Sequence, residues 1–143
     1  MRNRKAHAHA SRVVALLRVV LALAFVSAGT LHLLRTDAYA RIVPPQLPSP
    51  HALVLISGGA EIVGGIGLLI PRVRRLAGWS LIALLIAVFP ANVYMATAPE
   101  RFADLRVPTW ALWARLPLQL VLIAAVWWSA VRAARGRAGD AAS

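Results

Sequence analysis

One acidic side chain, Glu61, lies in the middle of a segment that is otherwise almost entirely glycine and aliphatic residues. An ionised carboxylate in apolar surroundings is costly unless it is paired, protonated or in contact with water. Acidic residues held in this way often exchange protons or bind a polar ligand. Glu61 is therefore the first candidate for chemistry in this sequence.

Other polar residues in apolar segments could act together with Glu61. Arg115 and Gln119 are one helical turn apart and would share a helix face, and Arg115 is the expected partner of Glu61. A buried Glu61–Arg115 pair that only sets the helix register is the alternative to a functional role. The whole candidate polar pocket comprises Glu61, Arg115, Gln119, Asn92, His32 and Ser57.

His32 could carry a proton, because imidazole changes its charge near neutral pH. A histidine near the end of an apolar segment can equally donate to a backbone carbonyl or contact lipid head groups, and both interpretations stay open. A haem is not expected, since it would want two axial ligands and the next histidine, His51, lies at a segment boundary.

Several kinds of chemistry are missing from the sequence. With no cysteine, the chain has no disulfide, thiolate metal site or dithiol relay of its own. It also has no phosphate-binding loop, no serine–histidine–acid arrangement and no cluster of metal ligands, so no metal site is expected. We therefore expect no self-sufficient hydrolase or metalloenzyme, and at most a membrane subunit of an oxidoreductase.

Long apolar segments must position the candidate residues, and 59% of the chain is hydrophobic. Each segment holds about 20 residues, enough for a helix to cross a bilayer core of roughly 30 Å. The sequence predicts an all-α membrane protein, a bundle of four transmembrane helices in a membrane domain over 13–131, with basic tails at 1–12 and 132–143. The expected spans are 13–34, 51–70, 76–95 and 108–131. A cleavable signal peptide is the alternative for the first span.

The positions of the basic residues predict the orientation. The net charge of +11 could indicate nucleic acid, but the charges form short clusters between apolar segments, so we expect membrane lipids and no nucleic acid as partners. The two tails and the turn at 71–75 are richer in arginine than the other two loops, which places both termini in the cytoplasm. The basic residues on that side are Arg2, Arg4, Lys5, Arg12, Arg72, Arg74, Arg75, Arg132, Arg135 and Arg137, and those on the other side are Arg35, Arg41, Arg101, Arg106 and Arg115.

Helix rise predicts the depth of each polar group. Trp110 and Trp128 are separated by about 27 Å of helix, which fits two interfacial aromatic belts and puts Gln119 near the midplane. The candidate residues then occupy the midplane and the non-cytoplasmic half. The cytoplasmic half is aliphatic except for Arg18, whose long side chain can reach the interface. The sequence therefore predicts a polar pocket that opens away from the cytoplasm.

Five segments carry a resemblance to a known family: AGTLHLL at 28–34, IVPPQLPSP at 42–50, SGGAEIVGGIGLLIPRVRRLAGWSL at 57–81, FPANVYMA at 89–96 and RLPLQ at 115–119. Together they resemble the DoxX-like family of small bacterial membrane proteins, over about residues 25–125. The resemblance implies a four-helix membrane fold in the bacterial cytoplasmic (inner) membrane. It also implies a link to quinone-dependent oxidoreductases or redox-defence complexes, and matches the candidate residues to the family's polar positions.

Two functions follow as hypotheses. In the first, the chain is a quinone-linked redox membrane subunit whose pocket holds a quinone head group and whose partners are other redox subunits. In the second, it is a non-catalytic anchor or assembly subunit whose glycine-rich segment packs on itself or on a partner. A transporter for small solutes is the least favoured, because no polar path crosses the cytoplasmic half.

Overall fold

The computed structural model describes residues 2–105 and 107–132, without the side chains of residues 2–8, 104 and 105. Every regular element in these residues is a helix. Four helices are long and apolar enough to cross a membrane, which confirms the predicted all-helical class with four candidate spans. In chain order the elements are α1 (Arg2–Leu34), α2 (Thr36–Ala40), α3 (Pro50–Leu69), α4 (Arg74–Thr97), η1 (Pro99–Leu105), α5 (Thr109–Val126) and η2 (Trp127–Arg132).

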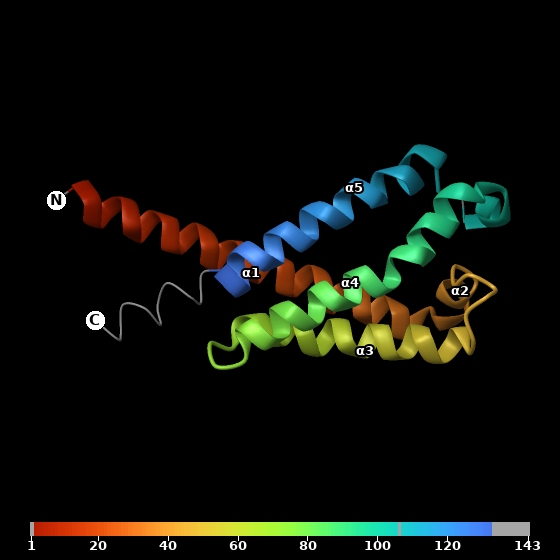
Figure 1. The fold of residues 1–143 in the computed structure, drawn as a ribbon, viewed down its shortest axis with the longest axis horizontal. Coiled ribbons are helices and arrows are strands. Elements are labelled where there is room, and N and C mark those ends of the chain that lie inside the picture. Colours follow the sequence, from red (N-terminus) through yellow and green to blue (C-terminus); the bar gives the residue numbers. More distant parts are fainter. Residues whose placement is uncertain (1, 106, 133–143) are drawn as a thin grey trace.

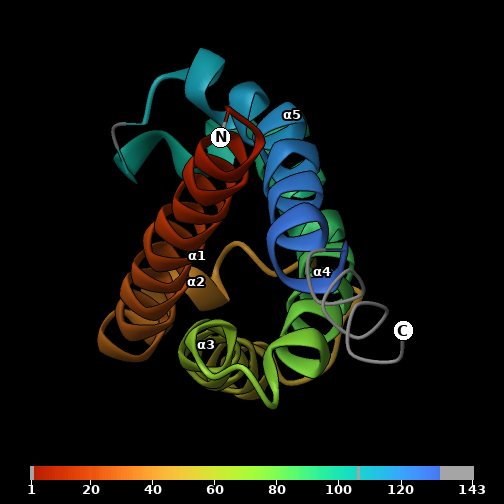
Figure 2. The ribbon, with the colours of Figure 1, turned by 90° about the vertical axis from the view of Figure 1, so that its left-hand side faces the viewer.

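The four long helices run up, down, up and down along one axis (Figure 1). The start of α1, the α3–α4 turn and η2 lie at one end, called here the termini end, whereas α2 and η1 lie at the opposite loop end (Figure 1). Seen end-on, α3 lies between α1 and α4 (Figure 2). Which end faces the cytoplasm stays a prediction.

The helix bounds differ from the expected spans by at most a few residues, except at the start of the chain. The helix α1 begins at Arg2 rather than near Val13, and its apolar part is His9–Leu34. Alanine and arginine are good helix formers, so the helix continues through the predicted N-terminal tail. The predicted C-terminal tail lies outside the described residues from 133 onward. So do Arg106 and the side chains of the basic residues before His9.

Glycines on α3 let the neighbouring helices approach closely. A Cβ atom on Gly58 would lie 2.9 Å from the Gly29 carbonyl oxygen of α1, and one on Gly64 would lie 2.6 Å from the Leu81 side chain of α4. A larger residue at position 58 would meet the backbone of α1 and displace that helix, and one at position 64 would displace the Leu81 side chain. The small residues of α3 thus let both α1 and α4 pack closely against it.

Near the termini end, α1 is tied to η2, the short π-helix at the end of the fourth span. Arg18 donates from Nε to the Ser129 carbonyl oxygen at 2.7 Å. Ser129 lies in η2, so this hydrogen bond joins the first span to the fourth. Arg18 was expected only to extend toward the interface, whereas the structure shows that it also bridges two helices.

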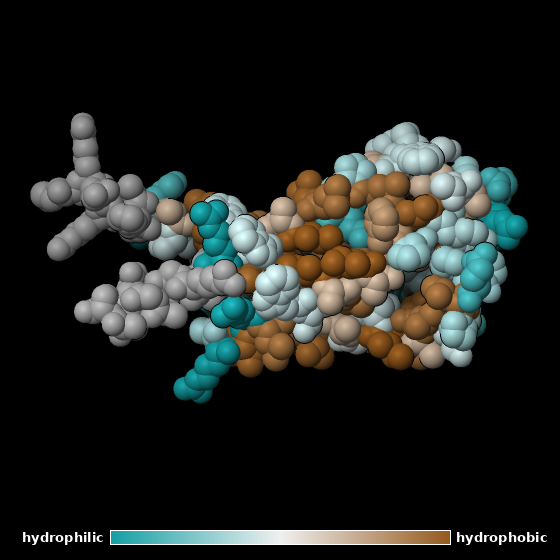
Figure 3. Space-filling model, viewed as in Figure 1, coloured by the Kyte–Doolittle hydropathy of each residue, from teal (hydrophilic) through white to brown (hydrophobic). Residues whose placement is uncertain are grey.

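The outer surface is the one that a bilayer would cover. Apolar side chains fill the middle of the visible face, and hydrophilic residues gather toward both ends (Figure 3). Exposed apolar residues include Val63 at 72% and Leu120 at 65%. In water this surface would be a large uncompensated apolar patch. The bilayer is the solvent that this surface fits.

Candidate functional site

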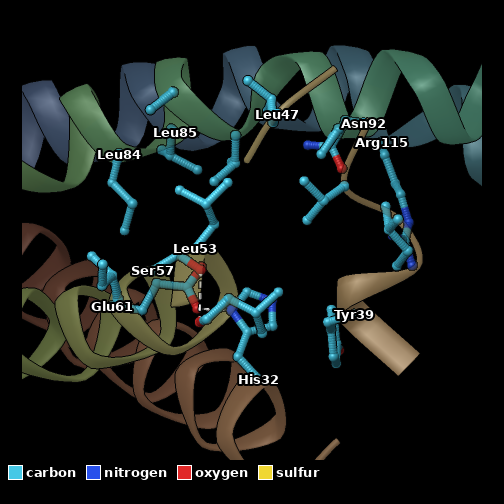
Figure 4. A pocket seen from close by; sticks show the side chains of 17 residues that line it. His32, Tyr39, Leu47, Leu53, Ser57, Glu61, Leu84, Leu85, Asn92 and Arg115 are labelled. Carbon is cyan, nitrogen blue, oxygen red and sulfur yellow. Dashed lines mark hydrogen bonds and ion pairs between the residues drawn. The ribbon is translucent and has the colours of Figure 1, made fainter. Parts of the chain in front are cut away.

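A cavity of about 380 Å³ lies between the helices in the half of the bundle toward the loop end. Figure 4 shows α4 on one side of it and α1 and α3 on the other. Most of its lining is aliphatic. Five of the six predicted site residues line it, namely His32, Ser57, Glu61, Asn92 and Arg115, whereas Gln119 does not.

Glu61 pairs with His32 and not with Arg115, so the expected Glu61–Arg115 pair is wrong. Glu61 Oε2 lies 3.1 Å from His32 Nδ1, and their side chains are 10% and 18% exposed. The reason is the helix order: α1 packs directly on α3 at Gly29 and Gly58, whereas α5 lies diagonally across the bundle. His32 sits on α1 one turn after Gly29, and its Cβ is close to Gly58.

The His32–Glu61 pair keeps hydrogen-bonding capacity. The two facing atoms are close enough to attract when the imidazole is protonated, but they are not aligned as a hydrogen bond, and both are buried with no other partner. Such buried groups are uncommon, and each is costly to leave unsatisfied. Both atoms therefore keep hydrogen-bonding capacity that a ligand in the cavity could use.

Tyr39, which the sequence analysis missed, completes this side of the site. Its ring lies edge-on to the His32 ring, with centroids 4.2 Å apart and planes at 72°, and it lines the cavity. Tyr39 lies on α2, the short helix at the start of the connection between α1 and α3. No spacing in the sequence reveals this contact, because the helix is interrupted at Arg35 and α2 begins in a new direction.

Arg115 occupies another wall of the cavity, on α5. Its Nη1 donates to the Met95 sulfur at 3.3 Å, and a thioether is only a weak acceptor. No carboxylate among the described residues forms an ion pair with it. A half-buried guanidinium with this partner retains donors that can bind an electron-rich oxygen.

Asn92 and Gln119 form two consecutive hydrogen bonds at the edge of the cavity. Asn92 donates from Nδ2 to Gln119 Oε1 at 2.8 Å, and Gln119 donates from Nε2 to the Leu85 carbonyl oxygen at 2.5 Å. Gln119 is 4% exposed, so its amide ties α5 to α4 instead of facing the cavity. Asn92 Oδ1 makes no hydrogen bond to the described residues, which leaves an acceptor at the cavity wall.

Ser57 has a local role. Its Oγ donates to the Val54 carbonyl oxygen at 2.9 Å, one turn back on α3. The hydroxyl proton is therefore used inside the helix, and the oxygen keeps acceptor capacity at the cavity wall. Ser57 adds polarity beside Glu61 without adding a donor.

The geometry thus presents two polar ends in an apolar chamber. One end holds the His32–Glu61 pair with Tyr39, and the other holds the Arg115 guanidinium and Asn92. In the described part of the chain no three potential metal ligands come together. A ligand that fits would be largely apolar, with polar atoms that meet the Arg115 guanidinium at one end and the His32–Glu61 pair at the other.

Comparison with known proteins identifies the family. A family model described as a domain of unknown function (DUF8561) matches residues 21–130, and the chain belongs to that family. The match covers every residue that lines the cavity. No curated protein and no solved structure matches the chain. The resemblance to the DoxX-like family is not tested by these comparisons and stays a prediction.

Proposed function

We propose that this member of the DUF8561 family is a multi-pass protein of the bacterial cytoplasmic membrane that binds the head ring of a quinone in the cavity. The observation that carries the proposal is the pair of polar ends, His32–Glu61 and Arg115, in an otherwise aliphatic chamber. A quinone has the matching shape, because its apolar ring carries two oxygens on opposite sides.

Different residues would contact the two quinone oxygens. The Arg115 guanidinium would donate to one carbonyl oxygen and hold the ring in place. The other oxygen would face His32 and Glu61. When a quinol is oxidised it gives up two electrons and two protons, and these two side chains can accept the protons. The electrons would pass to a partner redox subunit, so the chain would act as a membrane subunit of an oxidoreductase or redox-defence complex.

Two further observations support this assignment. The resemblance of segments 28–34, 57–81 and 89–96 to the DoxX-like family favours a redox role in a bacterial membrane. The excess of basic residues at the termini end supports a cytoplasmic location for both termini, which puts the cavity in the half of the membrane away from the cytoplasm.

The geometry gives less support to a pure anchor. That hypothesis relied on the glycine-rich helix packing on a second protein, but most of its glycines already face α1 or α4 within the chain. Only Gly59 has open space where a Cβ would be. The small residues are therefore used inside the bundle, whereas the cavity has no comparable structural use.

The test is quinone binding by the purified chain in detergent or nanodiscs. Decylubiquinone should raise the midpoint of thermal unfolding, and native mass spectrometry should find the complex. Arg115→Gln should weaken binding by about tenfold or more, because a charged hydrogen bond is worth about 1.5–3 kcal/mol. The matched control is Arg101→Gln, since Arg101 is exposed, contacts Tyr94 and does not line the cavity. Absence of any bound quinone and of any thermal shift would contradict the proposal.

A further inference from the structure

Toward the termini end, α3 and α4 are in close contact. Gly64 meets the Leu81 side chain, and Gly67 meets Ala77, whose Cβ would lie 2.7 Å from a Cβ placed on the glycine. All four residues are buried. The Leu81 side chain and the Ala77 methyl group fill the space beside these glycines, so this half of the interface is closed.

Toward the loop end, the same two helices separate. Pro90 lies inside α4, where its ring removes one backbone hydrogen bond and favours a bend. Figure 1 shows α4 turning away from α3 in this half. Side chains of the two helices, among them Ser57 and Leu85, then face one another across the cavity (Figure 4).

The opening between the separated helices is apolar and reaches the outer surface. Leu53 and Ile56 on α3 line the cavity and are 38% and 68% exposed, and Ala87 on α4 also lines it and is exposed. The cavity therefore extends sideways into the belt that the bilayer covers. Its charged groups lie on other walls: the cation Arg115 is on α5, and the pair of Glu61 with His32 spans α3 and α1.

We propose that the α3–α4 opening, defined by Leu53, Ile56, Ala87, Val88 and Ala91, is a lateral portal that holds the hydrocarbon tail of the bound molecule. This inference rests on the proposed function and narrows its ligand class to bilayer-resident amphiphiles with a chain on the ring. Arg115 supplies the charge complementarity for an electron-rich head-group oxygen, and the apolar portal leaves the chain in the lipid. A molecule that enters from water would not need an opening that faces the bilayer.

The portal governs steric access to the site and adds little affinity. Lipid tails are as apolar as the portal lining, so a chain gains little free energy by moving from the bilayer into it. A bulky residue in the portal should therefore exclude tailed ligands and leave the head-group site able to bind a ring without a tail.

The experiment compares two probes and two pairs of variants in nanodiscs. The probes are decylubiquinone and the same dimethoxy-methyl-benzoquinone ring without its chain. Ile56→Trp narrows the portal, and its control is Val63→Trp, two turns along the same face of α3, 72% exposed and outside the cavity lining. Ala87→Trp is a second portal variant, with Ala83→Trp, one turn away and exposed, as its control.

The portal variants should bind decylubiquinone at least about tenfold more weakly than the native chain, while the ring without a tail binds equally to all. Thermal unfolding of each variant checks that the fold is kept. Unchanged decylubiquinone binding by both portal variants would overturn the portal while the function stands. Equal loss of both probes would also overturn it, because the substitution would then act on the head-group site. Failure of the native chain to bind either probe would overturn both proposals.

Discussion

Replacement of a single glycine in the α1–α3 interface should separate packing from helix propensity. We consider Gly58→Ala. A Cβ atom at this position would lie 2.9 Å from the Gly29 carbonyl oxygen and 2.9 Å from His32 Cβ. Both neighbours belong to α1, and one is backbone, so neither can move without displacing that helix. Overpacking of this kind costs about 1–3 kcal/mol.

The neighbouring residue provides a matched control. Gly59→Ala adds the same atom to the same helix, but nothing lies within 4 Å of its Cβ position. Both variants gain about 1 kcal/mol of helix propensity, so this contribution cancels in the comparison. The difference between the two free energies of unfolding should therefore be about 1–3 kcal/mol, with Gly58→Ala the less stable.

The assay is reversible unfolding in mixed micelles, followed by circular dichroism as the denaturing detergent increases. The same displacement would move His32 away from Glu61, so Gly58→Ala should also weaken decylubiquinone binding, whereas Gly59→Ala should not. Equal stability of the two variants would refute the close approach of α1 to α3, and with it the reason that His32 reaches Glu61.

Two other predictions concern the acid–histidine pair and the orientation. Glu61→Leu and His32→Leu should each cost about 1–3 kcal/mol in the same assay, because each removes the polar group that lies 3.1 Å from the other buried side chain. The double variant should cost less than the sum by about 0.5–3 kcal/mol, and additive effects would show that the two side chains do not interact. Because the chain has no cysteine, single thiols can report the orientation. In intact cells an impermeant maleimide should label His51→Cys and should label Ser11→Cys only after the membrane is opened; the reverse pattern would invert the assigned topology.

Features that depend on neighbours along the chain could be predicted from the sequence. The four long helices follow from the length of the apolar segments, and their ends follow from local breaks such as the proline-rich segment 42–50 and Pro71. The gathering of most candidate polar groups toward one half of the bundle followed from the rise of a helix. Each of these inferences needs only the chemistry of adjacent residues.

Features that depend on how the helices face one another could not be predicted from the sequence. Arg115 was expected to partner Glu61, but the partner depends on which helix packs against α3 beside Glu61, and that helix is α1, which carries His32. The assignment of Gln119 to the pocket failed for a similar reason, since Asn92 and the Leu85 carbonyl hold its amide. Tyr39 entered the site only because α2 folds back against the end of α1.

The sequence by itself determined that this protein has four apolar helices with a carboxylate in the middle of the second. Only the tertiary structure decided which group meets that carboxylate and where the cavity opens. The physical reason is that hydropathy and helix rise place a residue along the helix axis, whereas its direction around the axis is set by packing between helices. Here the contact of Gly29 with Gly58 turns His32 toward Glu61, and the separation of α3 from α4 near Pro90 leaves the opening between them.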